Sequence, residues 1–99
     1  MQAVLEIFNY DEELKYKALR YVDIERDKID WKRVFDNDYG SGHFAAVVWG
    51  YCIWSSELPK TNPFDVGFSM DAGLRRRVLR ALAIVWSIPI DNMNTLRSA

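Results

Sequence analysis

The clearest pattern of hydrophobic and polar positions lies between Asp71 and Ile88, in the stretch DAGLRRRVLRALAIVWSI. Plotted at roughly 100° per residue, its large apolar residues fall mostly on one side of a helical wheel. The arc holds Leu74, Val78, Leu82 and Val85, with Leu79 and Trp86 beside them. The pattern predicts a helix over residues 72–87, capped by Asp71 and ended by Pro89, with the four residues of the arc buried.

The opposite side of this predicted helix is basic. It carries Arg76, Arg77 and Arg80, which could contact phosphate groups, since Arg76 and Arg80 lie one turn apart. Arg75 falls on the apolar arc, so we expect it either to meet a carboxylate, most simply Asp71, or to reach water past the helix end. No helix-turn-helix pattern accompanies the arginines. A solvated or internally paired basic face is therefore the favoured interpretation.

Charge is unevenly divided along the chain, although its net value is only −1. Residues 1–38 hold ten acids and seven bases, a net charge of −3. Residues 39–99 hold four acids and six bases, a net charge of +2. The two parts are complementary, so we expect the basic helix to pair with N-terminal acids. The overall balance does not favour a nucleic-acid partner, which would match a strongly basic domain.

Residues 43–56, HFAAVVWGYCIWSS, are apolar on every side. A helix of this character is normally buried all round, and residues 44–54 are the predicted central helix. A buried strand is the competing interpretation, because Val, Trp, Tyr and Ile favour sheets. Residues 2–8 suit either a strand or a helix, and residues 64–70 alternate apolar and polar positions with a period of two. These two segments are candidates for a small two-stranded element.

Shorter signals indicate further helices in the first part of the chain. Asn9 followed by Glu12 has the form of a capping box, and Asp30 can cap a short helix. Together, the patterns predict a mainly α fold: one domain over residues 1–99, with about four helices around the central one. An α+β fold is the alternative. Residues 91–99 are polar and expected to be frayed.

Composition restricts the class of protein more than its function. Hydrophobic residues make up 49% of the chain and include four tryptophans, which is ample for a core and argues against disorder. Cys52 is the only cysteine, which excludes an internal disulfide and a cysteine-based zinc site. The longest apolar run, Phe44–Trp49, is far shorter than the ~20 residues of a membrane span. With no basic leader at the N-terminus, we expect a cytoplasmic protein without a membrane partner.

Candidates for catalytic chemistry are few. His43 and Cys52 lie nine residues apart, about 180° on a helix, so they point to opposite faces and cannot form a nucleophile–base pair. His43 with Asp36 or Asp38 would be an incomplete acid–base site. The sequence therefore predicts no catalytic residue, no metal site and no cofactor.

The surplus of apolar surface predicts a non-enzymatic interaction module, expected to be a homodimer, although a different protein partner is also open. The candidate interface residues are Ile84, Trp86, Ile88, Trp49 and Trp54. Ile84 is placed on the arginine side of the last helix. The first alternative is a nucleic-acid or polyanion binder using Arg76, Arg77 and Arg80. The second is a binder of small ligands in a tryptophan-lined pocket.

Overall fold

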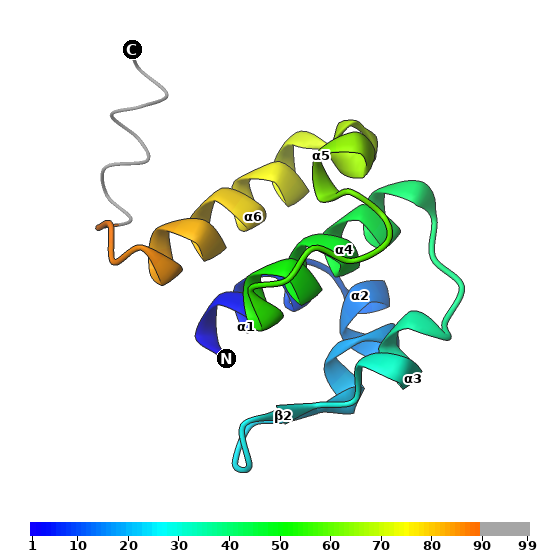
Figure 1. Cartoon of the computed structure of the whole chain (residues 1–99). Coiled ribbons are helices and arrows are strands. Elements are labelled where there is room, and N and C mark those ends of the chain that lie inside the picture. The colour runs from blue at the N-terminus through cyan, green and yellow to red at the C-terminus, as the bar shows by residue number, and fades with distance from the viewer. Residues whose placement is uncertain (90–99) are drawn as a thin grey trace.

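The fold is built around α4 (Ser41–Ser55), on which the other long helices pack. The structure, a computed structural model, describes residues 1–89. α1 (Gln2–Phe8) and α6 (Ala72–Val85) pack against one another and against α4 (Figure 1). The Cα radius of gyration of 13.0 Å is that expected of one compact domain of this length. The chain is a mainly α single domain, as predicted.

The central segment is a helix, not the strand that its β-branched and aromatic residues also allowed. Residues 45–50 of α4 are all buried, because α1, α6 and the segment after α4 each cover one side of the helix. Gly50 allows the close approach of α1: a Cβ at this position would lie 3.1 Å from Cε1 of Phe8. The all-round apolar pattern therefore gave the correct element.

The expected pairing of residues 2–8 with 64–70 is wrong, because both segments are helical. Residues 2–8 form α1, and residues 63–69 form α5 (Pro63–Val66) followed by the 3₁₀ helix η2 (Gly67–Ser69). The side-chain amide oxygen of Asn62 accepts a hydrogen bond from the Phe64 N–H at 2.9 Å and caps α5, with Pro63 in its first turn. The alternation of apolar and polar residues over 64–70 therefore does not mark a strand. It arises in two short helical segments in which Phe64 and Phe68 are both exposed.

A two-stranded element does exist elsewhere in the chain. β1 (Val22–Asp23) pairs antiparallel with β2 (Lys28–Ile29), and the register sets Val22 opposite Ile29. The hairpin extends from the body of the molecule (Figure 1). Asp27, with a φ of 55°, makes its turn in the left-handed region.

The remaining helices of the first part are short. They are α2 (Glu12–Lys17), the 3₁₀ helix η1 (Leu19–Tyr21) and α3 (Trp31–Phe35). Asp30 caps α3 as predicted, but α2 is capped by Asp11, whose carboxylate accepts from the Leu14 N–H at 2.8 Å. Asn9 ends α1 instead, donating to the Leu5 carbonyl at 2.8 Å. The expected capping box at Asn9 is therefore wrong by two residues.

α6 confirms the helix predicted over residues 72–87 and ends two residues earlier, at Val85. Leu74 and Val78 are buried as predicted, whereas Leu82 is only half-buried and the side chain of Val85 is exposed. The apolar side of α6 is thus buried in the first part of the helix and increasingly exposed toward its C-terminal end.

The buried face of α6 is turned toward the side that carries arginines, because α1 packs there. Arg77, Ala81 and Ile84 share one face at i, i+4 and i+7, and Arg77 hydrogen-bonds to Glu6 of α1. Ala81 is fully buried, and Ile84 is half-buried against the core. The expectation that Ile84 stands free among the arginines is corrected by this packing.

Candidate functional site

A groove lies between α4, the α5–η2 segment and α6, and we call it the apolar groove. Its volume is about 420 Å³. The residues that line it are Trp49, Phe64, Gly67, Phe68, Met70, Arg75, Val78, Leu79 and Leu82. Arg75 is the one charged residue among them, so the groove is suited to apolar contact rather than to acid–base chemistry.

Trp49 forms the inner wall of the apolar groove. Its side chain is only 9% exposed, and its ring meets that of Phe64 edge to face, with centroids 5.0 Å apart. The indole Nε1 is buried and has no hydrogen-bond partner among the described residues. A Cβ on Gly67 would lie 3.6 Å from this nitrogen, so a side chain here would stand against the indole.

Large apolar side chains project beside the apolar groove. Phe68 is 85% exposed, Phe64 69%, Trp86 64% and Leu79 52%. Leu79 lines the groove together with Leu82, whereas Trp86 follows the last residue of α6 and is not among the lining residues. We call Phe64, Phe68, Leu79 and Trp86 the apolar face. Exposed apolar side chains are ordinary when scattered, but a group of large ones around a groove is typical of a binding surface.

The start of α6 holds the apolar groove in shape. A carboxylate oxygen of Asp71 accepts a hydrogen bond from the Leu74 N–H at 2.8 Å and caps the helix. A guanidinium nitrogen of Arg75, Nη2, donates to the Phe68 carbonyl at 3.1 Å and ties α6 to η2. Arg75 was expected either to meet a carboxylate or to reach water. It is exposed and binds a backbone carbonyl, and Asp71 is not its partner.

Asp71 has a second partner, the phenol of Tyr10, whose hydroxyl lies 2.9 Å from Oδ2. The hydrogen bond from the Leu74 N–H, followed by that from Tyr10, lowers the pKa of Asp71 below its ordinary 3.8. The same hydrogen bond to Asp71 raises the pKa of Tyr10 above 10.0. Both shifts arise from a helix cap at the surface and not from a reactive centre.

The predicted interface residues are dispersed in the structure. Trp49 lines the apolar groove, and Trp86 is exposed just after α6. Ile88 is exposed just beyond α6, whereas Trp54 is half-buried and lines a different hollow with Ile53 and Val85. Phe64 and Phe68, which dominate the face, were not among the candidates. Their exposure follows from the helical turns of α5 and η2, which the alternating pattern concealed.

The three candidate anion-binding arginines do not form one free basic face. Nη1 of Arg77 donates to the Glu6 carbonyl at 3.2 Å and lies 3.6 Å from a Glu6 carboxylate oxygen. Nη1 of Arg80 lies 3.7 Å from the same oxygen. Arg76 is exposed and forms no salt bridge within residues 1–89. One N-terminal acid therefore pairs with two of the three arginines.

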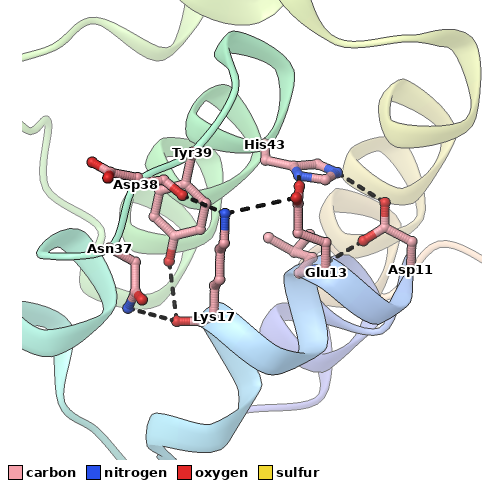
Figure 2. A network of polar contacts seen from close by, with 8 residues as sticks. Asp11, Glu13, Lys17, Asn37, Asp38, Tyr39 and His43 are labelled. Carbon is pink, nitrogen blue, oxygen red and sulfur yellow. Dashed lines mark hydrogen bonds and ion pairs between the residues drawn. The ribbon is translucent and has the colours of Figure 1, made fainter.

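A polar network joins α2 to the start of α4, and sequence reasoning missed it (Figure 2). Nε2 of His43 lies 2.8 Å from Asp11, and Nδ1 contacts a carboxylate oxygen of Glu13. Asp36 and Asp38, which the sequence allowed as partners of His43 only in an incomplete site, are not the carboxylates that it contacts. Because each ring nitrogen already faces a carboxylate, the imidazole has no free nitrogen for a substrate and clamps the two helices together.

The network continues from Glu13 to the segment between α3 and α4. The Lys17 ammonium lies 3.6 Å from Glu13 and donates to the Asp38 carbonyl at 2.6 Å. The Tyr39 hydroxyl donates to the Val34 carbonyl at 2.6 Å, and burial raises the pKa of this phenol to about 12. These bonds fix the loop that leads into α4.

No comparison with known proteins points to a function, so the arrangement of the described residues is the basis for one. Residues 1–89 contain no group of three His, Cys, Asp or Glu side chains placed to hold a metal ion. None of the described helices combines the length and apolar character needed to cross a membrane. The chain matches no protein-family model, and no similar protein is found among curated proteins or solved structures.

Proposed function

We propose that the protein is a non-enzymatic interaction module that forms a symmetric homodimer through the apolar face and the apolar groove. The observation that carries this proposal is that strongly exposed apolar side chains form part of the wall of the apolar groove itself. Phe68 is 85% exposed and is one of the residues that line the groove, whose lining is almost entirely apolar. A surface that holds both a projection and a recess can be self-complementary, which a two-fold interface requires.

Charges beside the apolar groove favour the same arrangement. Asp65 on α5 and Arg75 on α6 belong to the two elements that flank the groove, and both are exposed. Neither forms a salt bridge within residues 1–89. In a two-fold dimer, Asp65 of each copy would face Arg75 of the other, so one interface would contain two opposite-charge pairs. An aromatic centre with charges at its rim is the usual composition of such an interface.

The polyanion alternative has less support. Binding to nucleic acid or another polyanion needs several free cations on one surface, and Glu6 pairs with both Arg77 and Arg80. A different protein partner could use the same apolar face as a second copy. If the purified protein does not associate with itself, we conclude that the apolar face binds a different protein.

Light scattering after size-exclusion chromatography tests the homodimer directly. We expect a mass near twice that of the 11.6 kDa chain at about 100 µM protein, since a stable interface of ~1,000 Å² or more resists dilution to this range. Phe68→Glu and Leu79→Glu each place a charge in the apolar contact and should give monomers. Ile24→Glu is the matched control, because Ile24 is 60% exposed on the hairpin, outside the apolar face. A monomeric wild-type protein at high micromolar concentration would rule out the homodimer.

A charge exchange tests the orientation of the two copies. Asp65→Arg alone and Arg75→Asp alone should each weaken the dimer, because like charges then face one another across the interface. The double variant restores opposite charges and should associate more strongly than either single variant, although the hydrogen bond from Arg75 to the Phe68 carbonyl stays lost. If both single variants dimerise as well as the wild type, these two residues do not face one another in the dimer.

A further inference from the structure

A second pocket, of about 410 Å³, lies between α3, α4 and the loop that follows α4, and we call it the aromatic pocket. Trp31 and Phe35 of α3 and Tyr51 of α4 form its apolar wall, and residues 59–61 close its other side. This volume is in the range of small-molecule sites, and a mostly apolar wall with a few polar groups is their usual composition. The aromatic pocket shares no lining residue with the apolar groove.

The three rings of the aromatic pocket pack mainly edge to face. Trp31 and Tyr51 have centroids 5.3 Å apart at 88°, and Phe35 and Tyr51 have centroids 5.8 Å apart at 74°. Phe8 supports Trp31 from behind with a further edge-to-face contact at 5.9 Å. A planar ring bound here would extend the cluster with the same preferred geometry.

The charge of the aromatic pocket is positive. Lys32 and Lys60 line it, and no acidic residue does. Neither ammonium group has a salt-bridge or hydrogen-bond partner in the part of the chain that the structure describes. Thr61 and Tyr51 add hydroxyl groups to the lining. Two unpaired cations above an aromatic wall favour a ligand that is both flat and anionic.

We propose that the aromatic pocket binds a small planar aromatic anion, such as an aromatic carboxylate. The ring lies against Trp31, Phe35 and Tyr51, and the anionic group is held by Lys32 and Lys60.

A titration with 2-naphthoate, followed by two-dimensional ¹H–¹⁵N NMR, tests this site. The indole N–H signal of Trp31, assigned by its loss in Trp31→Phe, should shift with a Kd of roughly 0.1–1 mM. The neutral 2-naphthamide has the same ring and nearly the same size. It should bind about tenfold more weakly, because it lacks the charge that Lys32 and Lys60 contact.

Paired lysine variants separate a specific site from general attraction of anions. Lys32→Ala with Lys60→Ala should weaken 2-naphthoate binding about tenfold or more. Lys15→Ala with Lys28→Ala removes the same charge at positions outside the pocket and should leave binding unchanged. Equal affinity for the acid and the amide, or shifts confined to Trp49 in the apolar groove, would refute the site. So would the absence of any shift of the Trp31 signal at several millimolar ligand.

Discussion

A single carboxylate at Asp71 links two parts of the chain that are 61 residues apart. Its oxygens accept from the Leu74 N–H at the start of α6 and from the Tyr10 hydroxyl beyond α1. The first bond satisfies one of the free N–H groups of the helix end, and the negative charge suits the positive end of the helix dipole. The start of α6, which borders the apolar groove, is therefore sensitive to this side chain.

Asp71→Ala should reduce the free energy of unfolding by about 1 kcal/mol, because the cap is lost. Asp71→Asn keeps an acceptor oxygen and should cost less. The folded-state pKa of Asp71 is below its ordinary 3.8, so its ionised form stabilises the fold above that value. This stability is lost as the pH falls through the lowered pKa. Urea unfolding from about pH 6 to about pH 2 should show the gap between wild type and Asp71→Asn closing at the acid end.

At the residue scale, helix N-caps were easier to predict from the sequence than the hydrogen-bond partners of side chains. Asp30 and Asp71 were identified correctly, because a cap is decided by neighbours within three residues. For His43, the acids weighed from the sequence were Asp36 and Asp38, because they lie nearby in the chain. Its partners are Asp11 and Glu13, 32 and 30 residues away, and only the folded chain brings them together. No local spacing carries that information.

At the scale of elements, a close backbone contact joins the start of α4 to η2. A Cβ on Gly42 would lie 2.9 Å from the Ser69 carbonyl oxygen, which is closer than real contacts allow. The obstacle is backbone, so it cannot turn away as a flexible side chain would. Gly42 therefore lets η2, and with it Phe68, sit close to α4 and form one side of the apolar groove.

Gly42→Ala should destabilise the protein by about 1–3 kcal/mol, although alanine is normally the better helix former. Gly40→Ala is the matched control two residues earlier. A Cβ on Gly40 meets nothing within 4 Å, so the change should cost less than about 1 kcal/mol, the loss expected because alanine is a poorer helix cap than glycine. Thermal unfolding of both variants compares the two sites. Equal melting temperatures would show that η2 does not need to lie this close to α4.

The elements themselves were predictable where the pattern was long. α4 and α6, which have 15 and 14 residues, were located from the long consistent patterns over residues 43–56 and 71–88. Residues 2–8 and 64–70 are too short for a period to separate helix from strand. For α6, the helical wheel predicted the helix correctly but misplaced its buried side. α1 and α4 both pack on α6, so its buried side extends to Ile84, and a wheel cannot show which neighbours a helix has.

At the scale of the whole molecule, the candidate site depends on contacts that no single segment contains. The apolar groove joins Trp49 of α4 to Phe68 of η2 and Leu79 of α6. Trp49 and Trp86 were predictable as candidates, because surplus aromatic residues can be counted in the sequence. Phe64 and Phe68 were not, since their exposure depends on how the α5–η2 segment packs on α4.

The uneven charge of the chain also has a structural counterpart at this scale. Glu6, from the acidic N-terminal part, lies between Arg77 and Arg80 of the basic helix and joins α1 to α6. The side chain of Glu6 is 24% exposed and that of Arg77 31%, so this pairing is partly shielded from water. Partial burial makes this pairing less sensitive to salt than a fully exposed salt bridge, which contributes ~0–1 kcal/mol.

Glu6→Gln should leave Arg77 and Arg80 without their shared carboxylate and so create the free basic face that the native protein lacks. We expect a loss of roughly 1 kcal/mol in the free energy of unfolding and clearly stronger retention on heparin at low salt. Glu57→Gln, at an exposed position, changes the net charge by the same amount and is the control. If Glu6 masks the arginines, only Glu6→Gln gains retention, and Arg77→Ala with Arg80→Ala removes the gain. Identical elution of the two glutamine variants would mean that net charge alone sets heparin binding and that the salt bridges with Glu6 do not limit access to the arginines.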